Sequence, residues 1–200
     1  AIVFNPSFPY RFMHMALAAF LVSGLLVAAT AAWHLLKGRR DALVKKSFSM
    51  AMWMILALAP LQVFVGDLHG LNTLEHQPAK LAAIEGHWET NKDHGMSLYL
   101  FGIPDMEAEE TKYAVGIPNL GSLIMTHSLD GEVKGLKEFA PEDRPNSLVV
   151  FWSFRIMVGM GVLMLLLAAL GAWSRISGKF YESKWLHKFA LWMGPSGFIA

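Results

Sequence analysis

An almost uncharged run of 26 residues occupies positions 148–173: LVVFWSFRIMVGMGVLMLLLAALGAW, with Arg155 as its one charged side chain. A helix needs roughly 20 apolar residues to cross a bilayer core of about 30 Å, so this run can span a membrane. Two runs without any charge, 12–36 and 48–66, meet the same criterion. Each could be a buried helix of a soluble protein, but three such runs in 200 residues favour a membrane protein.

The composition agrees with membrane spans and excludes several kinds of chemistry. Of the 200 residues, 54% are hydrophobic and 16% are charged, whereas about 25% charged residues is usual for soluble domains. The chain has no cysteine, which excludes disulfides, zinc–thiolate sites, iron–sulfur clusters and cysteine catalysis. It lacks an initiator Met and stops inside the apolar run 189–200. We therefore expect an internal piece of a longer protein, with a fourth span cut short.

The placement of charges orients the spans. The connection 37–47 and the segment 174–188 are both rich in Lys and Arg, and loops of that kind stay on the cytoplasmic side. The segment between them, 67–147, then lies on the outer face, where it contributes 14 acidic and 6 basic residues. A structureless loop of that length would be unusual, so we expect this segment to be functional and partly folded.

Two short helices are expected in the outer segment. Residues 80–86 (KLAAIEG) are good helix formers as far as the glycine, which is a common helix terminator. Residues 105–113 (DMEAEETKY) follow a proline and begin with an aspartate, a favourable N-terminal cap, so they predict an acidic helix.

The predicted fold is therefore an all-α membrane protein: a transmembrane helix bundle of about four spans, the last one truncated, with a large, partly helical extracytoplasmic loop. Residues 1–66 hold two spans joined by a basic cytoplasmic loop. Residues 67–147 form the outer loop. Residues 148–200 hold the third span, a second cytoplasmic loop and the start of a fourth helix.

Three side chains near the outer ends of the spans could carry chemistry, because polar groups inside a bilayer are costly and often functional. His14 lies in the first span, and Arg155 and Met157 lie in the third. An imidazole and a thioether form an axial pair of low-spin haems, and the small residues Ala18 and Gly161 would leave room for a porphyrin. Arg155 could pair with a haem propionate. An interfacial His, a Met that only packs and an Arg that reaches the headgroups remain the alternatives.

A second group of polar residues lies in the outer segment. Lys80 and Glu85 are five residues apart, roughly 140° around a helix, which does not favour a helical ion pair. They could flank a ligand instead, with the carboxylate accepting a proton from a hydroxyl that loses electrons; the alternative is a solvated helix face. Three histidines could bind zinc, but their spacing matches no zinc pattern: His69, His76 and His87.

Five stretches of the chain carry a family resemblance. They are NPSFPYRFMHM (5–15), GDLHGLNTLEHQPAKLAAIEGHWET (66–90), FGIPDMEAEETKYA (101–114), THSLDGEVKGLKEF (126–139) and FWSFRIMVGMG (151–161). With these motifs and its spans, the chain resembles subunit I of the cytochrome bd-type quinol oxidases over essentially its whole length. The absence of a long insertion before the FRIM motif indicates the short-loop branch, often called the cyanide-insensitive oxidases.

The resemblance implies a respiratory terminal oxidase that oxidises membrane quinol, reduces dioxygen to water and generates a proton gradient. It implies that a low-spin haem b has His14 and Met157 as axial ligands, with Arg155 close to this haem. The ligands of a high-spin haem b and a haem d would lie outside residues 1–200, so this piece would carry the electron-entry half of the subunit.

The resemblance also assigns the outer segment as a quinol-binding loop in which Lys80 and Glu85 act in quinol oxidation. Asp67, the first residue of this loop, is a third catalytic candidate. The implied partners are ubiquinol or menaquinol, dioxygen, a second oxidase subunit and the lipid bilayer of a bacterial inner membrane, with no nucleic acid. The outer loop would be periplasmic. Two other classes stay open from the residues alone: a membrane transporter that uses Arg155 and the acidic loop, and a cofactor-free assembly subunit.

Overall fold

A computed structural model describes residues 5–91 and 94–200. The chain divides into two compact units. One, the helical unit, comprises the chain up to residue 66 together with 156–200, and the other, the loop unit, comprises residues 67–155.

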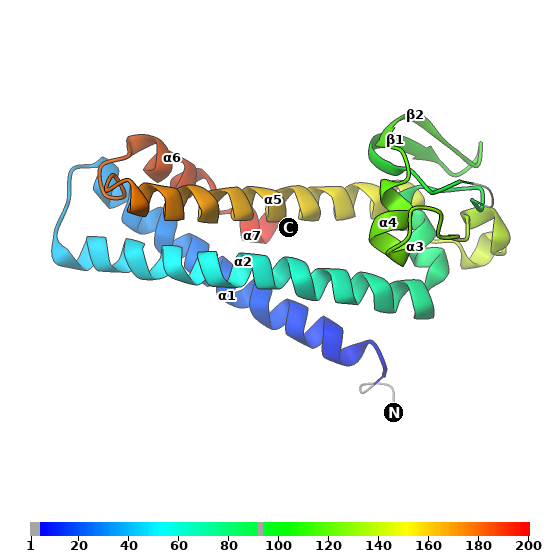
Figure 1. The fold of residues 1–200 in the computed structure, drawn as a ribbon, viewed down its shortest axis with the longest axis horizontal. Coiled ribbons are helices and arrows are strands. Elements are labelled where there is room, and N and C mark those ends of the chain that lie inside the picture. The colour runs from blue at the N-terminus through cyan, green and yellow to red at the C-terminus, as the bar shows by residue number, and fades with distance from the viewer. Residues whose placement is uncertain (1–4, 92–93) are drawn as a thin grey trace. The chain divides into compact units, whose positions relative to one another are not determined.

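Three long helices dominate the chain: α1 (Phe8–Leu36), α2 (Ala42–His76) and α5 (Ser147–Ile176) (Figure 1). The three apolar runs thus form helices, as predicted, and all three helices are long and apolar enough to cross a membrane. Helix α2 continues ten residues beyond its predicted end, and Pro60 lies inside it. Its extension belongs to the loop unit and leads directly into the next short helix.

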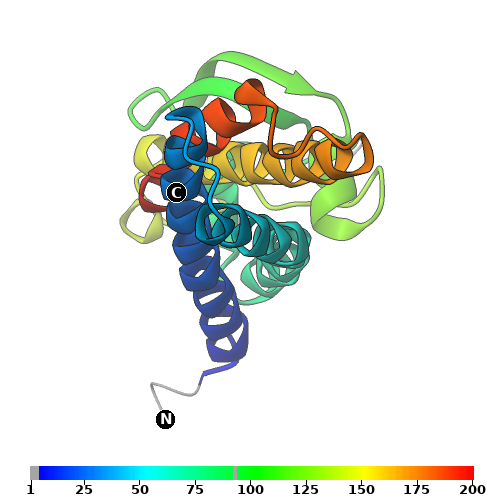
Figure 2. The same cartoon turned by 90° about the vertical axis from the view of Figure 1, so that its left-hand side faces the viewer.

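The core of the helical unit is built from α1, α2, α5 and the short helix α6 (Lys184–Trp192). Small side chains of α1, such as Ala28 and Ala32, are fully buried and allow close helix packing. Helix α6 packs against α1, as Figure 2 shows from the end of the bundle. The ring of Phe48 on α2 is fully buried and contacts the rings of Phe180 and His187.

The structure differs from the expectation of a fourth span that starts near Phe189. Helix α6 ends at Trp192, a turn follows, and α7 covers only Ser196–Ile199. Pro195 explains the break, because proline has no backbone N–H and its ring clashes with a preceding helical turn. The described residues therefore contain three helices of membrane-spanning length, not a fourth.

The loop unit contains a β-hairpin, which corrects both the all-α class and the helix predicted over 105–113. Strands β1 (Leu98–Asp105) and β2 (Glu110–Ile117) pair antiparallel, with Leu98 opposite Ile117 and Asp105 opposite Glu110. The carboxylate of Asp105 accepts hydrogen bonds from the backbone N–H groups of Glu107 and Ala108 at 2.9 and 3.0 Å. The cap expected for a helix thus closes a turn, and β-branched and aromatic residues on both sides form strands.

Helix α3 (Pro78–Glu85) is the central element of the loop unit. One small core gathers Leu81 with Met96, which precedes β1, and with Met125 and Val133, which follow β2. A second gathers Ala82 and Ala83 with Trp88 and Leu136. Helix α4 (Leu120–Thr126) and two 3₁₀ turns, Leu136–Glu138 and Pro141–Asp143, complete the unit.

Candidate functional site

The carboxyl end of α3 is fixed by glycine and by the hairpin. Gly86 ends the helix with a left-handed φ of 68°, as its sequence position predicts. A side chain there would bring its Cβ within 2.9 Å of the ring of Phe151 on α5. Thr111 on β2 donates a hydrogen bond to the Gly86 carbonyl at 2.6 Å and accepts one from the Trp88 indole at 3.2 Å. The end of α3, where Glu85 lies, is therefore fixed by the Phe151 ring on α5 and by Thr111 on β2.

Glu85 is 0% exposed. Its Oε2 accepts a hydrogen bond from Nη2 of Arg155 at 3.3 Å, whereas its Oε1 has no hydrogen-bond partner among the described residues. Burial raises the pKa of the Glu85 carboxyl, and the nearby guanidinium of Arg155 offsets part of that effect. A buried carboxyl with one unsatisfied oxygen is placed to accept a proton.

Arg155 joins three elements of the loop unit. Its Nε donates to the Tyr99 carbonyl on β1 at 2.8 Å, and its Nη1 donates to the Ile84 carbonyl on α3 at 2.5 Å. Its guanidinium carbon lies 3.5 Å from the centre of the Phe151 ring. The cost of a charge in an apolar segment is thus met by backbone carbonyls, an aromatic face and the carboxylate of Glu85.

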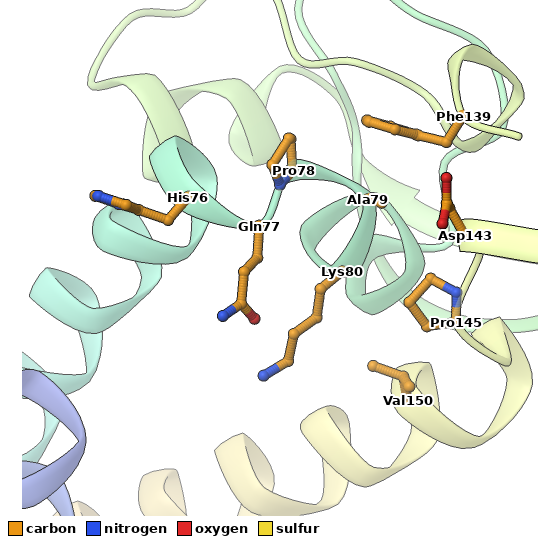
Figure 3. A pocket seen from close by; sticks show the side chains of 9 residues that line it. All are labelled: His76, Gln77, Pro78, Ala79, Lys80, Phe139, Asp143, Pro145 and Val150. Carbon is orange, nitrogen blue, oxygen red and sulfur yellow. The ribbon is translucent and has the colours of Figure 1, made fainter. Parts of the chain in front are cut away.

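Lys80 lines a cavity of about 510 Å³ at the start of α3. In Figure 3 the side chains of Lys80 and Gln77 extend in the same direction, while Phe139 and Asp143 lie on the other side of α3. The lining combines polar groups with apolar walls: His76, Gln77, Pro78, Ala79, Lys80, Phe139, Asp143, Pro145 and Val150. Glu85 is not part of this lining, so the two predicted quinol-loop residues occupy different surroundings.

A second cavity, of about 470 Å³, begins directly after Glu85. Gly86 and His87 line it, together with Tyr99, Thr111 and the polar side chains Glu89, Thr90, Asn91, His94, Ser97, Glu109, Glu110 and Lys137. His87 is partly buried; its Nε2 lies 2.7 Å from the Ser97 carbonyl and its ring stacks on Tyr99, with centroids 4.5 Å apart. Burial lowers the pKa of His87.

Asp67 is not part of the Glu85–Arg155 cluster. Its carboxylate lies 4.0 Å from Nε2 of His127; the His127 side chain is largely exposed and that of Asp67 is half-buried. The zinc alternative gains no support, because the described residues contain no group of three His, Asp or Glu side chains arranged to hold a metal ion.

The two residues predicted to bind haem both belong to the helical unit. His14 on α1 is partly buried, and a Cβ at Gly66 would lie 3.3 Å from its ring. Met157 on α5 is also partly buried, and a Cβ at Gly159 or Gly161 would meet no atom within 4 Å. Gly161, four residues after Met157, lies on the same face of the helix and leaves open space there. An imidazole with a thioether is a suitable donor set for a low-spin haem.

Several contributors to the site were missed by the sequence reasoning. The carbonyls of Tyr99 and Ile84 and the hydroxyl of Thr111 gave no signal, because each acts through tertiary contacts between distant segments. His87 was considered only as one of three candidate zinc ligands. The pairing of Glu85 with Arg155 had one available signal: each is the one charge in a short uncharged stretch, LAAIEG or FWSFRIM, and their charges are opposite.

These features define a multi-pass membrane protein with a buried, paired acid at the end of a short helix. The chain belongs to the cytochrome bd terminal oxidase subunit I family, whose model matches residues 1–200. This is a family of haem-containing oxidases.

The similar proteins agree with this assignment. The chain is 27% identical to the cytochrome bd-II ubiquinol oxidase subunit 1 of Escherichia coli (strain K12) and covers 51% of it. It is 30% identical to the cytochrome bd ubiquinol oxidase subunit 1 of Bacillus subtilis (strain 168) and covers 44% of it; both matches include the whole of this chain. The solved bd oxidase of Geobacillus thermodenitrificans matches 99% of this chain with a TM-score of 0.88 and 33% identity, and 46% of that protein is covered. The chain thus spans about half the length of its relatives.

Proposed function

We propose that this chain is the part of a bd-type terminal oxidase, of the short-loop branch, that takes electrons and protons from a membrane quinol. The observation that carries the proposal is Glu85: a carboxyl with no solvent exposure, one unsatisfied oxygen and an arginine that fixes the other. A buried base with a raised pKa is suited to accept the proton of a substrate hydroxyl. The names of the relatives, ubiquinol oxidase subunits, support quinol as the substrate class.

Three residues of the loop unit have separate roles in quinol oxidation. Lys80, on the wall of an amphipathic cavity, donates a hydrogen bond to a quinol oxygen and orients the headgroup. Glu85 does not line that cavity, so it accepts the hydroxyl proton on Oε1 through an intervening water molecule. Arg155 keeps Oε2 in place and stabilises the charged form of the carboxylate before the transfer. Asp67 stands apart from this group, at the first residue of the loop unit, beside His127.

His14 and Met157 would hold a low-spin haem b, which supplies a one-electron acceptor when it is bound. The loop unit would face the outer side of a bacterial inner membrane, where the released protons contribute to a proton gradient. Dioxygen reduction, the high-spin haem b and the haem d would belong to other parts of the subunit, in a complex with a second subunit. The quinol could be ubiquinol or menaquinol.

The test is Glu85→Gln in the full-length oxidase. A positioned general base typically contributes 10²–10⁴-fold, so quinol oxidation should fall by about 100-fold or more while the low-spin haem spectrum is kept. Glu75→Gln is the matched control, because the Glu75 side chain is 78% exposed, and it should leave the rate unchanged. Wild-type rates in Glu85→Gln would refute the proposal.

The haem assignment has its own test. His14→Ala and Met157→Leu should each abolish the six-coordinate low-spin spectrum in the purified oxidase, because each removes one axial ligand. Met160→Leu, in the same helix, should leave that spectrum intact. A low-spin spectrum that survives both ligand substitutions would refute this assignment without affecting the role of Glu85.

A further inference from the structure

Glu85 needs a route by which an accepted proton can leave. Its side chain is 0% exposed, and it does not line the cavity that contains Lys80. A base that cannot lose its proton acts once and then stops, so turnover requires a second group between this carboxyl and solvent.

The second cavity of the loop unit starts at the two residues that follow Glu85. Gly86 has no side chain, and His87 is the first titratable residue of the lining. The carboxylates of Glu89, Glu109 and Glu110 also line this cavity; Lys137 pairs with Glu89 and Arg144 with Glu109. Glu110 forms no ion pair among the described residues, and a carboxylate at a cavity wall attracts cations, including hydrated protons.

The contacts of His87 leave one nitrogen for proton transfer. Nε2 lies 2.7 Å from the Ser97 carbonyl, which can only accept, so Nε2 carries the hydrogen and Nδ1 carries the lone pair in the neutral ring. Stacking on Tyr99, with an interplanar angle of 8°, fixes the plane of the ring. The Tyr99 carbonyl in turn accepts from Arg155, the partner of Glu85. The imidazole is thus tied to the same network as the buried acid.

We propose that the cavity behind His87 is the proton outlet of Glu85, with Nδ1 of His87 as the relay. This inference rests on the proposed function. The O–H bond of the quinol breaks as Glu85 Oε1 gains the proton; a water molecule then passes a proton from Oε1 to Nδ1; and His87 releases it through the cavity to solvent. No electron moves in the relay, and both groups return to their starting state.

Burial acts on both groups of the proposed relay. It raises the pKa of Glu85 and lowers that of His87, so each group favours its neutral form. The charged and titratable groups around His87 are the guanidinium of Arg155, which opposes protonation of the ring, and those of the cavity lining: Tyr99, His94, Lys137, Glu89, Glu109 and Glu110.

The test uses His87→Gln in the full-length oxidase, since glutamine can still donate to the Ser97 carbonyl but cannot carry a proton at neutral pH. We expect kcat for quinol oxidation to fall at least about 10-fold, with KM and the haem spectrum unchanged. In His87→Ala, added imidazole should restore much of the lost kcat. His34→Gln, a partly buried histidine of the helical unit, is the matched control and should behave as wild type.

Two results would overturn the outlet. One is a wild-type kcat in His87→Gln across the pH range, and the other is a loss in which KM rises and imidazole restores nothing, which would show a structural role. Either result, together with a large effect of Glu85→Gln, would leave the proposed function standing. A wild-type rate in Glu85→Gln would instead overturn both.

Discussion

Arg155 and Arg175 lie near the two ends of α5, and their burial is compensated differently. Arg175 donates through Nη2 to the carbonyl and the hydroxyl of Ser49 at 2.9 and 3.0 Å. Its guanidinium carbon lies 3.8 Å from the centre of the Phe180 ring and 5.0 Å from that of Trp53. No carboxylate forms an ion pair with it among the described residues.

Arg155 has the same kinds of partner, carbonyls and an aromatic ring, and a buried carboxylate in addition. Arg175 shows that an arginine in this helix does not need an acid. Burying a carboxylate is itself costly, and a buried ion pair is often no more stable than apolar side chains of similar volume. The comparison therefore indicates that Glu85 is present for its proton chemistry and not to neutralise Arg155.

The largest expected effect separates the two arginines directly. Arg155→Leu leaves the buried Glu85 carboxylate without its cation, which should cost about 3–5 kcal/mol of stability. Arg175→Leu removes only hydrogen bonds and ring contacts and should cost about 1–3 kcal/mol. Thermal unfolding of the full-length oxidase in detergent measures both. Equal losses would contradict the comparison, and Arg155→Leu with Glu85→Leu should recover part of the larger loss.

The second effect is a pH dependence of the quinol oxidation rate. It should depend on Glu85, the partner of Arg155, and not on Arg175. Because burial raises the pKa of Glu85, the carboxyl stays protonated at a pH where an ordinary glutamate is charged. Quinol oxidation should fall as the pH drops through this raised value, and Glu85→Gln should remove that acid limb. The sign for stability is opposite: the contribution of Glu85 is present below the ordinary carboxyl pKa and is lost as the pH rises. Arg175→Leu should keep the acid limb of the rate.

A third effect compares two threonines. Thr111 links the Gly86 carbonyl to the Trp88 indole, so Thr111→Val should lower stability by about 1–3 kcal/mol, because it leaves buried groups unpaired. Thr30 is exposed and bonds only to carbonyls of its own helix, Leu26 and Val27. Thr30→Val should change stability by less than about 0.5 kcal/mol. Similar values by thermal unfolding would mean that the hairpin does not anchor α3.

The smallest expected effect lies at the tip of the hairpin. Hydrogen bonds, first from Lys112 and then from two backbone N–H groups, lower the pKa of Asp105 to about 2. The stabilisation is present above the ordinary carboxyl pKa and is lost as the pH falls toward this value. The ratio of pepsin cleavage of the wild-type hairpin to that of Asp105→Asn should therefore rise as the pH falls from about 4 to about 2, since the protease's own pH dependence cancels in this ratio. A ratio that does not change with pH would assign the loss to another group.

The sequence predicts the helical unit better than the loop unit, for a physical reason. A run such as 148–173 is long and uncharged, so the bilayer criterion identifies it without tertiary information. The segment 105–113 is short and polar, and its fate depends on what Asp105 bonds to: a helix cap and a turn begin with the same residue. Residues 110–112 pair with β1, and this pairing favours the turn over the helix.

The candidate site was predictable only residue by residue. Lys80 and Glu85 were identified from their spacing and the family motif, and Arg155 from its isolation in an apolar run. That Glu85 is buried against Arg155, and that Lys80 lines a separate cavity, depends on contacts across 70 residues of chain. The roles of His14 and Met157 as haem ligands stay predictions.

Gly86 couples the movement of α3 to that of α5. Its missing side chain lets the Phe151 ring rest against the end of α3, and the guanidinium of Arg155 lies over that same ring. Helix α3 and the first turns of α5 therefore pack closely against each other. A substrate that displaces α3 also has to displace the first turns of α5. Because Gly86 has no side chain, a movement of α3 is passed to α5 through the Phe151 ring.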